Sequence, residues 1–123
     1  MYLYEIKITD AGLGHLEGLT QLTELYLNGT RVTDAGLEHL KGMRQLQTLV
    51  LDKTNVADTG MEHLRGLTQL ERLFLSGTHV TDAGLEHLKG LNQLQELWVG
   101  GTPITDEGIE KLRQALPNCK IER

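Results

Sequence analysis

The feature that most constrains the fold of this chain is a unit of 24 residues that repeats along it. The stretch "TDAGLEHLKG" occurs at 33–42 and again at 81–90, with close variants at 9–18, 57–66 and 105–114. A unit this short cannot bury its apolar side chains alone, so equivalent units are expected to stack and share one core. The 123 residues are the length of a single domain, 1–123.

Aligning the chain on itself defines the boundaries of the units. A partial first unit spans 1–21, and a C-terminal unit that leaves the pattern after Leu112 spans 94–123. Three full units lie between them, at 22–45, 46–69 and 70–93.

Each unit is predicted to begin with a short strand and a turn. In "LTELYL", Leu25 and Leu27 alternate with polar or aromatic residues, which is the pattern of a strand that buries one face. Gly29 then allows the chain to turn. A threonine follows each turn, and its inward hydroxyl is expected to hydrogen-bond to loop backbone; these are Thr30, Thr54, Thr78 and Thr102.

A short helix is predicted after the turn. Its apolar positions are Leu37, Leu40 and Met43. Thr33 or Asp34 stands where a helix N-cap belongs, because a side-chain oxygen there accepts a hydrogen bond from a free amide of the first turn.

This arrangement resembles the leucine-rich repeat family, and most closely its bacterial subtype with "T-x-V-T-D-A-G-L", which is related to the cysteine-type and ribonuclease-inhibitor-like repeats. Four segments carry the resemblance, "LTELYL", "LQTLVL", "LERLFL" and "LQELWV". One departure is threonine where the family usually has asparagine or cysteine after the strand. The resemblance implies an α/β fold, a right-handed curved solenoid of about five repeats, with a parallel sheet on the concave face and short helices on the convex face.

A column of aspartates lies at the start of the predicted helices, at Asp10, Asp34, Asp58, Asp82 and Asp106. An acidic side chain suits the positive end of the helix dipole. Where Ala57 replaces threonine, Asp58 is expected to supply the cap. A catalytic carboxylate pair needs two unlike environments, whereas this column repeats one environment. No catalytic residue is therefore predicted.

A column of histidines, His15, His39, His63 and His87, ends in Lys111. Packed helices lie roughly 8–10 Å apart, whereas zinc holds each ligand at about 2 Å. These side chains are therefore expected to pack between neighbouring helices, and no metal site is predicted. Nucleotide-binding, esterase and zinc-protease motifs are also missing from the sequence. The chain is expected to be non-enzymatic and to need no cofactor.

Composition excludes several classes of partner. The net charge is −5 and the basic residues are scattered, so no nucleic-acid surface is expected. The single cysteine, Cys119, excludes an internal disulfide and is expected to be a small buried apolar residue. No apolar run is long enough to insert into a membrane, and no signal peptide is visible. The localisation stays unknown, with a lean toward the cytoplasm.

Side chains that alternate with the inward leucines should point out from the sheet. All five aromatic residues fall in two of these outward columns, where they would form a nearly continuous stripe. Exposed aromatic stripes favour binding of a protein or peptide, although cross-strand rings also stabilise a sheet by themselves. The predicted ligand-binding residues are Tyr2, Tyr4, Glu24, Tyr26, Val50, Asp52, Arg72, Phe74, Glu96 and Trp98.

Two alternatives stay open at this point. The first residues place Met1, Leu3, Ile6 and Ile8 at inward positions with no capping helix before them. Either the chain is part of a longer array or another chain covers this end, so the alternative function is self-association through this end or through the aromatic stripe. A carbohydrate ligand is also compatible with aromatic platforms. The C-terminal stretch is expected to finish the array with a charged helix and a short strand that holds Cys119 and Ile121.

Overall fold

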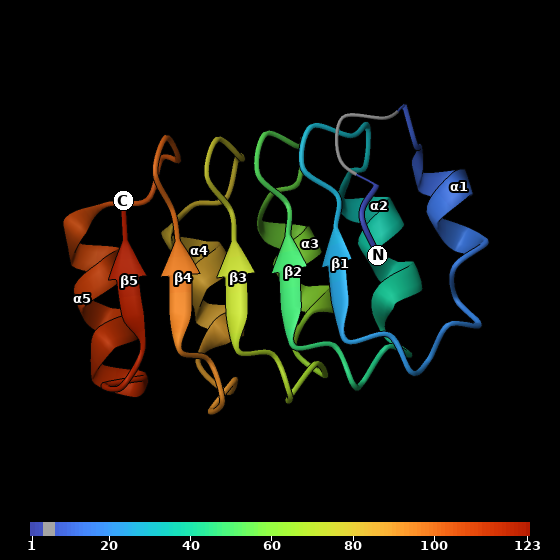
Figure 1. Ribbon diagram of the computed structural model, residues 1–123. Coiled ribbons are helices and arrows are strands. Elements are labelled where there is room, and N and C mark those ends of the chain that lie inside the picture. Colours follow the sequence, from blue (N-terminus) through green and yellow to red (C-terminus); the bar gives the residue numbers. More distant parts are fainter. Residues whose placement is uncertain (4–6) are drawn as a thin grey trace.

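A computed structural model describes residues 1–3 and 7–123. Within this part of the chain, five parallel strands form one sheet in the order of the sequence (Figure 1). The strands are β1 (Glu24–Tyr26), β2 (Thr48–Val50), β3 (Arg72–Phe74), β4 (Glu96–Trp98) and β5 (Lys120–Glu122). Each residue pairs with the residue 24 positions later, as Leu25 does with Leu49. The predicted α/β solenoid with a parallel sheet is confirmed.

Short helices lie side by side behind one face of the sheet, one before each strand (Figure 1). They are α1 (Asp10–Gly14), α2 (Asp34–Leu37), α3 (Asp58–His63), α4 (Asp82–Leu85) and the longer α5 (Asp106–Ala115), with single 3-10 turns η1 (Glu38–Leu40) and η2 (Glu86–Leu88) continuing α2 and α4. In the described part of the chain, no helix has the length and apolar character needed to cross a membrane.

One hydrophobic core fills the space between the sheet and the helices. The inward strand residues Leu25 and Leu27 are completely buried, as are the helix residues Leu37 and Leu40. The same positions recur from unit to unit, so the core runs continuously from Leu13 to Ile121. Each buried leucine of such a core stabilises the fold by roughly 2–5 kcal/mol relative to alanine.

The turns after the strands follow the prediction from the sequence. The hydroxyl of Thr30 donates to the carbonyl oxygen of Leu27 at 2.7 Å, and the other three threonines of the column make the same bond. Gly29, Gly77 and Gly101 have φ angles of 72°, 73° and 69°, which glycine adopts without strain. At the equivalent position of the second full unit stands Lys53, with a φ of 58°.

Each aspartate of the column is the first residue of its helix, as predicted, but the structure adds a contact between units that was not predicted. Ala57 is the N-cap of α3, and no side chain caps that helix. The carboxylate of Asp58 is directed away to the next unit, where it accepts from the backbone N–H of Thr81 at 2.7 Å and from its hydroxyl at 2.6 Å. The prediction that Asp58 caps its own helix is therefore wrong.

The same bond joins each pair of neighbouring units. The backbone N–H of Ala57 donates to Asp34 at 2.6 Å, and Thr105 donates to Asp82 through its amide and hydroxyl at 2.8 and 2.5 Å. Asp106, at the start of the last helix, pairs with Arg123 at 2.8 Å. We call this series the aspartate ladder: the carboxylates of Asp10, Asp34, Asp58 and Asp82, each of which accepts a hydrogen bond from a backbone N–H of the next unit.

The C-terminal unit ends as the sequence predicts. Helix α5 buries Ile109 and Leu112 and exposes its charged side. Strand β5 then adds Ile121 to the core, and Cys119 lies buried just before the strand.

Candidate functional site

The candidate site is the side of the sheet that carries no helix, which we call the open face (Figure 1). Its side chains come from the first and third residue of each strand, because the middle residue points into the core. The strand register aligns them in two rows across the sheet. One row is Glu24, Thr48, Arg72, Glu96 and Lys120, and the other is Tyr26, Val50, Phe74, Trp98 and Glu122.

The aromatic rings of the open face form two pairs. Tyr2, which pairs with β1 through an isolated bridge, has its ring centroid 4.5 Å from that of Tyr26. The centroids of Phe74 and Trp98 lie 6.1 Å apart, with ring planes only 8° from parallel. The nearly continuous stripe expected from the sequence is therefore wrong, because Val50 separates the two pairs.

Val50 does not contribute an accessible surface. Its exposed fraction is 8%, although it points to the open face, because it lies between the larger side chains of Tyr26 and Phe74. Thr48, in the other row, is 2% exposed. Strand β2 thus supports its neighbours and offers little for a partner to contact. Tyr4, another predicted site residue, lies outside the described residues.

Most charged groups of the open face already have partners within the chain. The indole N–H of Trp98 donates to Glu96 at 3.4 Å, and Lys120 forms an ion pair with Glu122 at 3.4 Å. Lys120 and Glu122 were missed by the sequence analysis. The register would have placed both, since each stands 24 residues after a predicted site residue.

Asp52 is the half-buried acid of the open face. It accepts a hydrogen bond from the backbone N–H of Ser76 at 2.8 Å. Burial raises the pKa of Asp52, and the bond from Ser76 and the charge of Lys53 oppose that rise without cancelling it. The Asp52 side chain thus links the turn after β2 to the turn after β3, which is a structural role.

Arg72 and Glu24 differ from these groups. Arg72 is exposed, and its guanidinium makes no hydrogen bond or ion pair with any described residue. The carboxylate of Glu24 likewise has no described partner. Among the described strand residues of the open face, these two are the charged side chains that make no hydrogen bond or ion pair.

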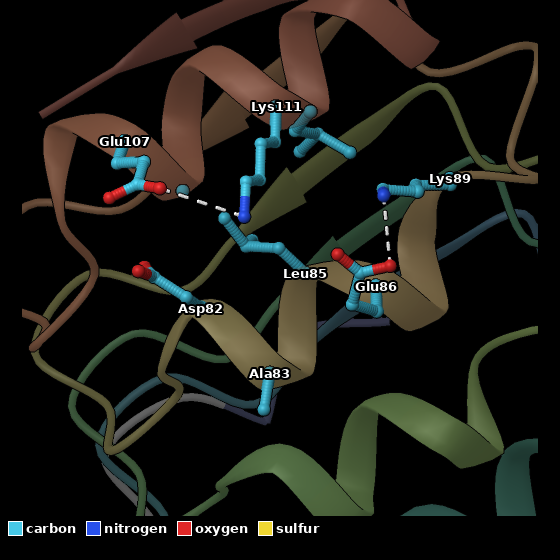
Figure 2. A pocket seen from close by; sticks show the side chains of 9 residues that line it. Asp82, Ala83, Leu85, Glu86, Lys89, Glu107 and Lys111 are labelled. Carbon is cyan, nitrogen blue, oxygen red and sulfur yellow. Dashed lines mark ion pairs between the residues drawn. The ribbon is translucent and has the colours of Figure 1, made fainter.

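A groove of about 250 Å³ lies on the helix side, between α4 and α5 (Figure 2). Four of its five charged side chains form ion pairs, Lys89 with Glu86 at 2.8 Å and Lys111 with Glu107 at 3.7 Å, and the fifth, Asp82, accepts hydrogen bonds from Thr105. The bond from Lys89 lowers the pKa of the Glu86 carboxyl. The groove thus carries little uncompensated charge for a ligand.

The groove has a packing explanation. Three units earlier, the His39 ring packs against α1, 3.2 Å from where a Cβ on Gly14 would lie, and contacts Glu17. Lys111 takes the place of this histidine and pairs with Glu107 on its own helix α5 instead of packing against α4 (Figure 2), so the slot between the two helices stays open.

The histidines behave as packing residues. The Nδ1 atoms of His63 and His87 are buried without a hydrogen-bond partner. Among the described residues, no cluster of three or more histidine, cysteine or acidic side chains is arranged to hold a metal. Burial and the nearby Glu96 raise the pKa of the Cys119 thiol to about 11, which makes it a poor nucleophile at neutral pH.

Comparisons with known proteins agree with this geometry. Residues 44–104 match one family model described as leucine rich repeat, and residues 18–41 match a second with the same description. The chain belongs to the leucine-rich repeat family. Leucine-rich repeat proteins commonly act as protein-binding modules and are typically non-enzymatic. The bacterial subtype stays a prediction. The comparison with curated proteins gave no match.

Solved leucine-rich repeat structures superpose well on the chain. Internalin C2 of Listeria monocytogenes has a TM-score of 0.75 and 30% identity, over 88% of this chain and 44% of that protein. A leucine-rich repeat protein of Leptospira interrogans has a TM-score of 0.79 at 24% identity, over 100% of this chain and 30% of that protein. An internalin from Listeria monocytogenes, inlF, has a TM-score of 0.63 at 22% identity, over 97% of this chain and 39% of that protein. The last two show the fold alone, and the chain spans less than half the length of all three.

Proposed function

We propose that this chain is a protein- or peptide-binding module whose contact surface is the open face. The observation that carries the proposal is the Phe74–Trp98 pair, two parallel rings half-exposed on a face that no helix covers. The four aromatic residues described by the structure all lie on this face. Aromatic and arginine side chains are enriched among the residues that dominate binding energy.

Within the open face, Phe74, Trp98 and Tyr26 would anchor the partner through apolar contact. Arg72 and Glu24 would set its charge preference, because their charges are not compensated within the described chain. Val50 lies between Tyr26 and Phe74 and is too buried to contact the partner.

The experiment is a selection of binders from a random dodecapeptide library displayed on phage. Selected peptides are then titrated against the chain, with fluorescence of Trp98 as the signal; it is the single tryptophan and lies on the open face. Replacing Phe74 and Trp98 with alanine in separate variants is expected to weaken binding at least about tenfold, measured by calorimetry. Glu62→Ala, exposed on α3 behind the sheet, is the matched control and should bind normally.

Urea unfolding of the same variants separates binding from sheet stabilisation. If Phe74→Ala and Trp98→Ala retain full affinity and only unfold more easily, the rings serve the sheet and the proposal is wrong. If the control Glu62→Ala loses the peptides instead, the contact surface lies on the helix side.

Self-association is a second candidate because an apolar hollow lies at the N-terminal end of the sheet. It is lined by Met1, Leu19 and Leu22, and the exposed fractions of Met1 and Leu19 are 38% and 41%. Light scattering over a concentration series tests it. A dimer that dissociates in Leu19→Gln supports this function, and a monomer at every concentration contradicts it.

A further inference from the structure

Arg72 stands out among the cations of the open face. Of the two basic residues at outward strand positions, Lys120 is paired with Glu122, whereas Arg72 has no described partner. Its register neighbour Glu96 accepts from the indole of Trp98 instead. The guanidinium of Arg72 therefore lies beside the aromatic pair without an ion pair among the described residues.

The position of Arg72 relative to that pair fits one kind of ligand. Arg72 and Phe74 are the first and third residues of β3 and project on the same side, about 6.5 Å apart along the strand. An extended peptide repeats its own side chains at the same interval on one face. A guanidinium holds a carboxylate through two parallel hydrogen bonds, which lysine cannot do.

We infer that the open face recognises a peptide segment with an acidic residue two positions from an aliphatic or aromatic residue. The carboxylate binds the guanidinium of Arg72, and the apolar side chain lies on the Phe74–Trp98 pair. This inference rests on the proposed function and names the class of partner.

Glu24 limits the choice further. It lies in the same row as Arg72, two strands away, which is about 10 Å. Its carboxylate, and that of Glu96 one strand from Arg72 on the other side, repel further acidic residues of a segment that lies along β3. The preferred segment therefore carries a single acidic residue opposite Arg72, and a run of acidic residues binds less well.

The experiment repeats the peptide selection with the unchanged chain and with Arg72→Gln. Peptides from the unchanged chain are expected to be enriched in Asp or Glu two positions from an apolar residue, and this enrichment should vanish with Arg72→Gln. The affinity of a selected peptide should fall about tenfold with Arg72→Gln. Arg65→Gln, which removes an exposed arginine on the helix side, is the matched control.

Exchanging the charges of Arg72 and of the peptide acid tests whether Arg72 contacts the peptide directly or acts through a change in folding. Arg72→Glu should lose the selected peptide and recover binding when the acid of that peptide is replaced by lysine, which a change in folding would not produce. If selected peptides depend on Phe74 and Trp98 but show no acidic preference, the inference is overturned while the proposed function stands. If no selected peptide depends on the aromatic pair, the proposed function fails as well.

Discussion

The carboxylate of Asp58 accepts two hydrogen bonds from Thr81, one from the backbone N–H at 2.7 Å and one from the hydroxyl at 2.6 Å. Thr81 is the N-cap of α4, so the bond ties the start of one helix to the start of the next. The repeated "TD" of the sequence is thus a contact between units. This contact fixes how neighbouring units align, because its hydrogen bonds form only when the two units stand in register.

Removing one carboxylate from the aspartate ladder should destabilise the fold. Asp58→Ala leaves the amide and hydroxyl of Thr81 without their acceptor, and we expect the free energy of unfolding to fall by about 1–3 kcal/mol. Urea denaturation measures it. Thr59→Ala, at the exposed next position of α3, is the control and should change little. An unchanged midpoint for Asp58→Ala would show that the ladder is not a stabilising contact.

The glycine of "TDAGL" is coupled to the same ladder. At Gly108, the three atoms nearest to an added Cβ all belong to the carboxyl group of Asp82. Hydrogen bonds from Thr105, the larger effect from its hydroxyl and the smaller from its amide, lower the pKa of Asp82 and hold that carboxylate in place. Either the Cβ clashes or the carboxylate moves and gives up its bonds to Thr105.

Gly108→Ala should therefore destabilise the chain by about 1–3 kcal/mol, the usual cost of overpacking. In an Asp82→Ala background, Gly108→Ala should instead stabilise the chain, because alanine favours a helix over glycine by about 1 kcal/mol. Thermal unfolding of the two single variants and the double variant forms the cycle. Stabilisation by Gly108→Ala in both backgrounds would show that the carboxylate does not restrict this position.

The turn at Lys53 is the strained member of its series. Its φ of 58° lies in the left-handed region, which costs a side-chain-bearing residue roughly 1–2 kcal/mol, and the equivalent turns use glycine. Lys53→Gly should stabilise the fold by about 0.5–1 kcal/mol, since part of the gain is offset by the greater freedom of glycine in the unfolded chain. Lys53→Ala removes the same charge but keeps the backbone strain. If Lys53→Ala stabilised the fold as much as Lys53→Gly, the effect would come from the charge and not from the strain.

What the sequence predicts and what it misses follow from the range of each interaction. Leu25 and Thr30 are placed correctly because strand alternation and the turn are local patterns. Asp58 is misassigned because an aspartate at this position could either cap its own helix or accept a hydrogen bond from the next unit, and both roles give the same sequence pattern. Only the approach of two units, which no local pattern specifies, separates these roles.

The open face shows the same limit. Alternation correctly directs Val50 outward, but its burial depends on the two larger side chains beside it in the register. Lys120 was overlooked because the irregular stretch before it hides the 24-residue spacing. The sequence also does not show that Arg72 lacks an ion pair. By the 24-residue spacing alone, Glu96 would be expected to pair with Arg72, whereas in the structure it accepts from Trp98.

The raised pKa of Asp52 predicts a pH dependence with a defined sign. Burial raises the pKa of this carboxyl in the folded chain above its ordinary value of 3.8. Between those two values the folded state binds more protons than the unfolded state, so the contribution of Asp52 to stability falls as pH rises through that window. Asp52→Asn lacks this titration and keeps an oxygen that accepts from Ser76. The stability of Asp52→Asn relative to the unchanged chain should therefore increase from about pH 3 to about pH 7, measured by urea unfolding at each pH. A difference that is constant with pH, or that shrinks as pH rises, would mean that the ionised carboxylate is not disfavoured in the folded chain.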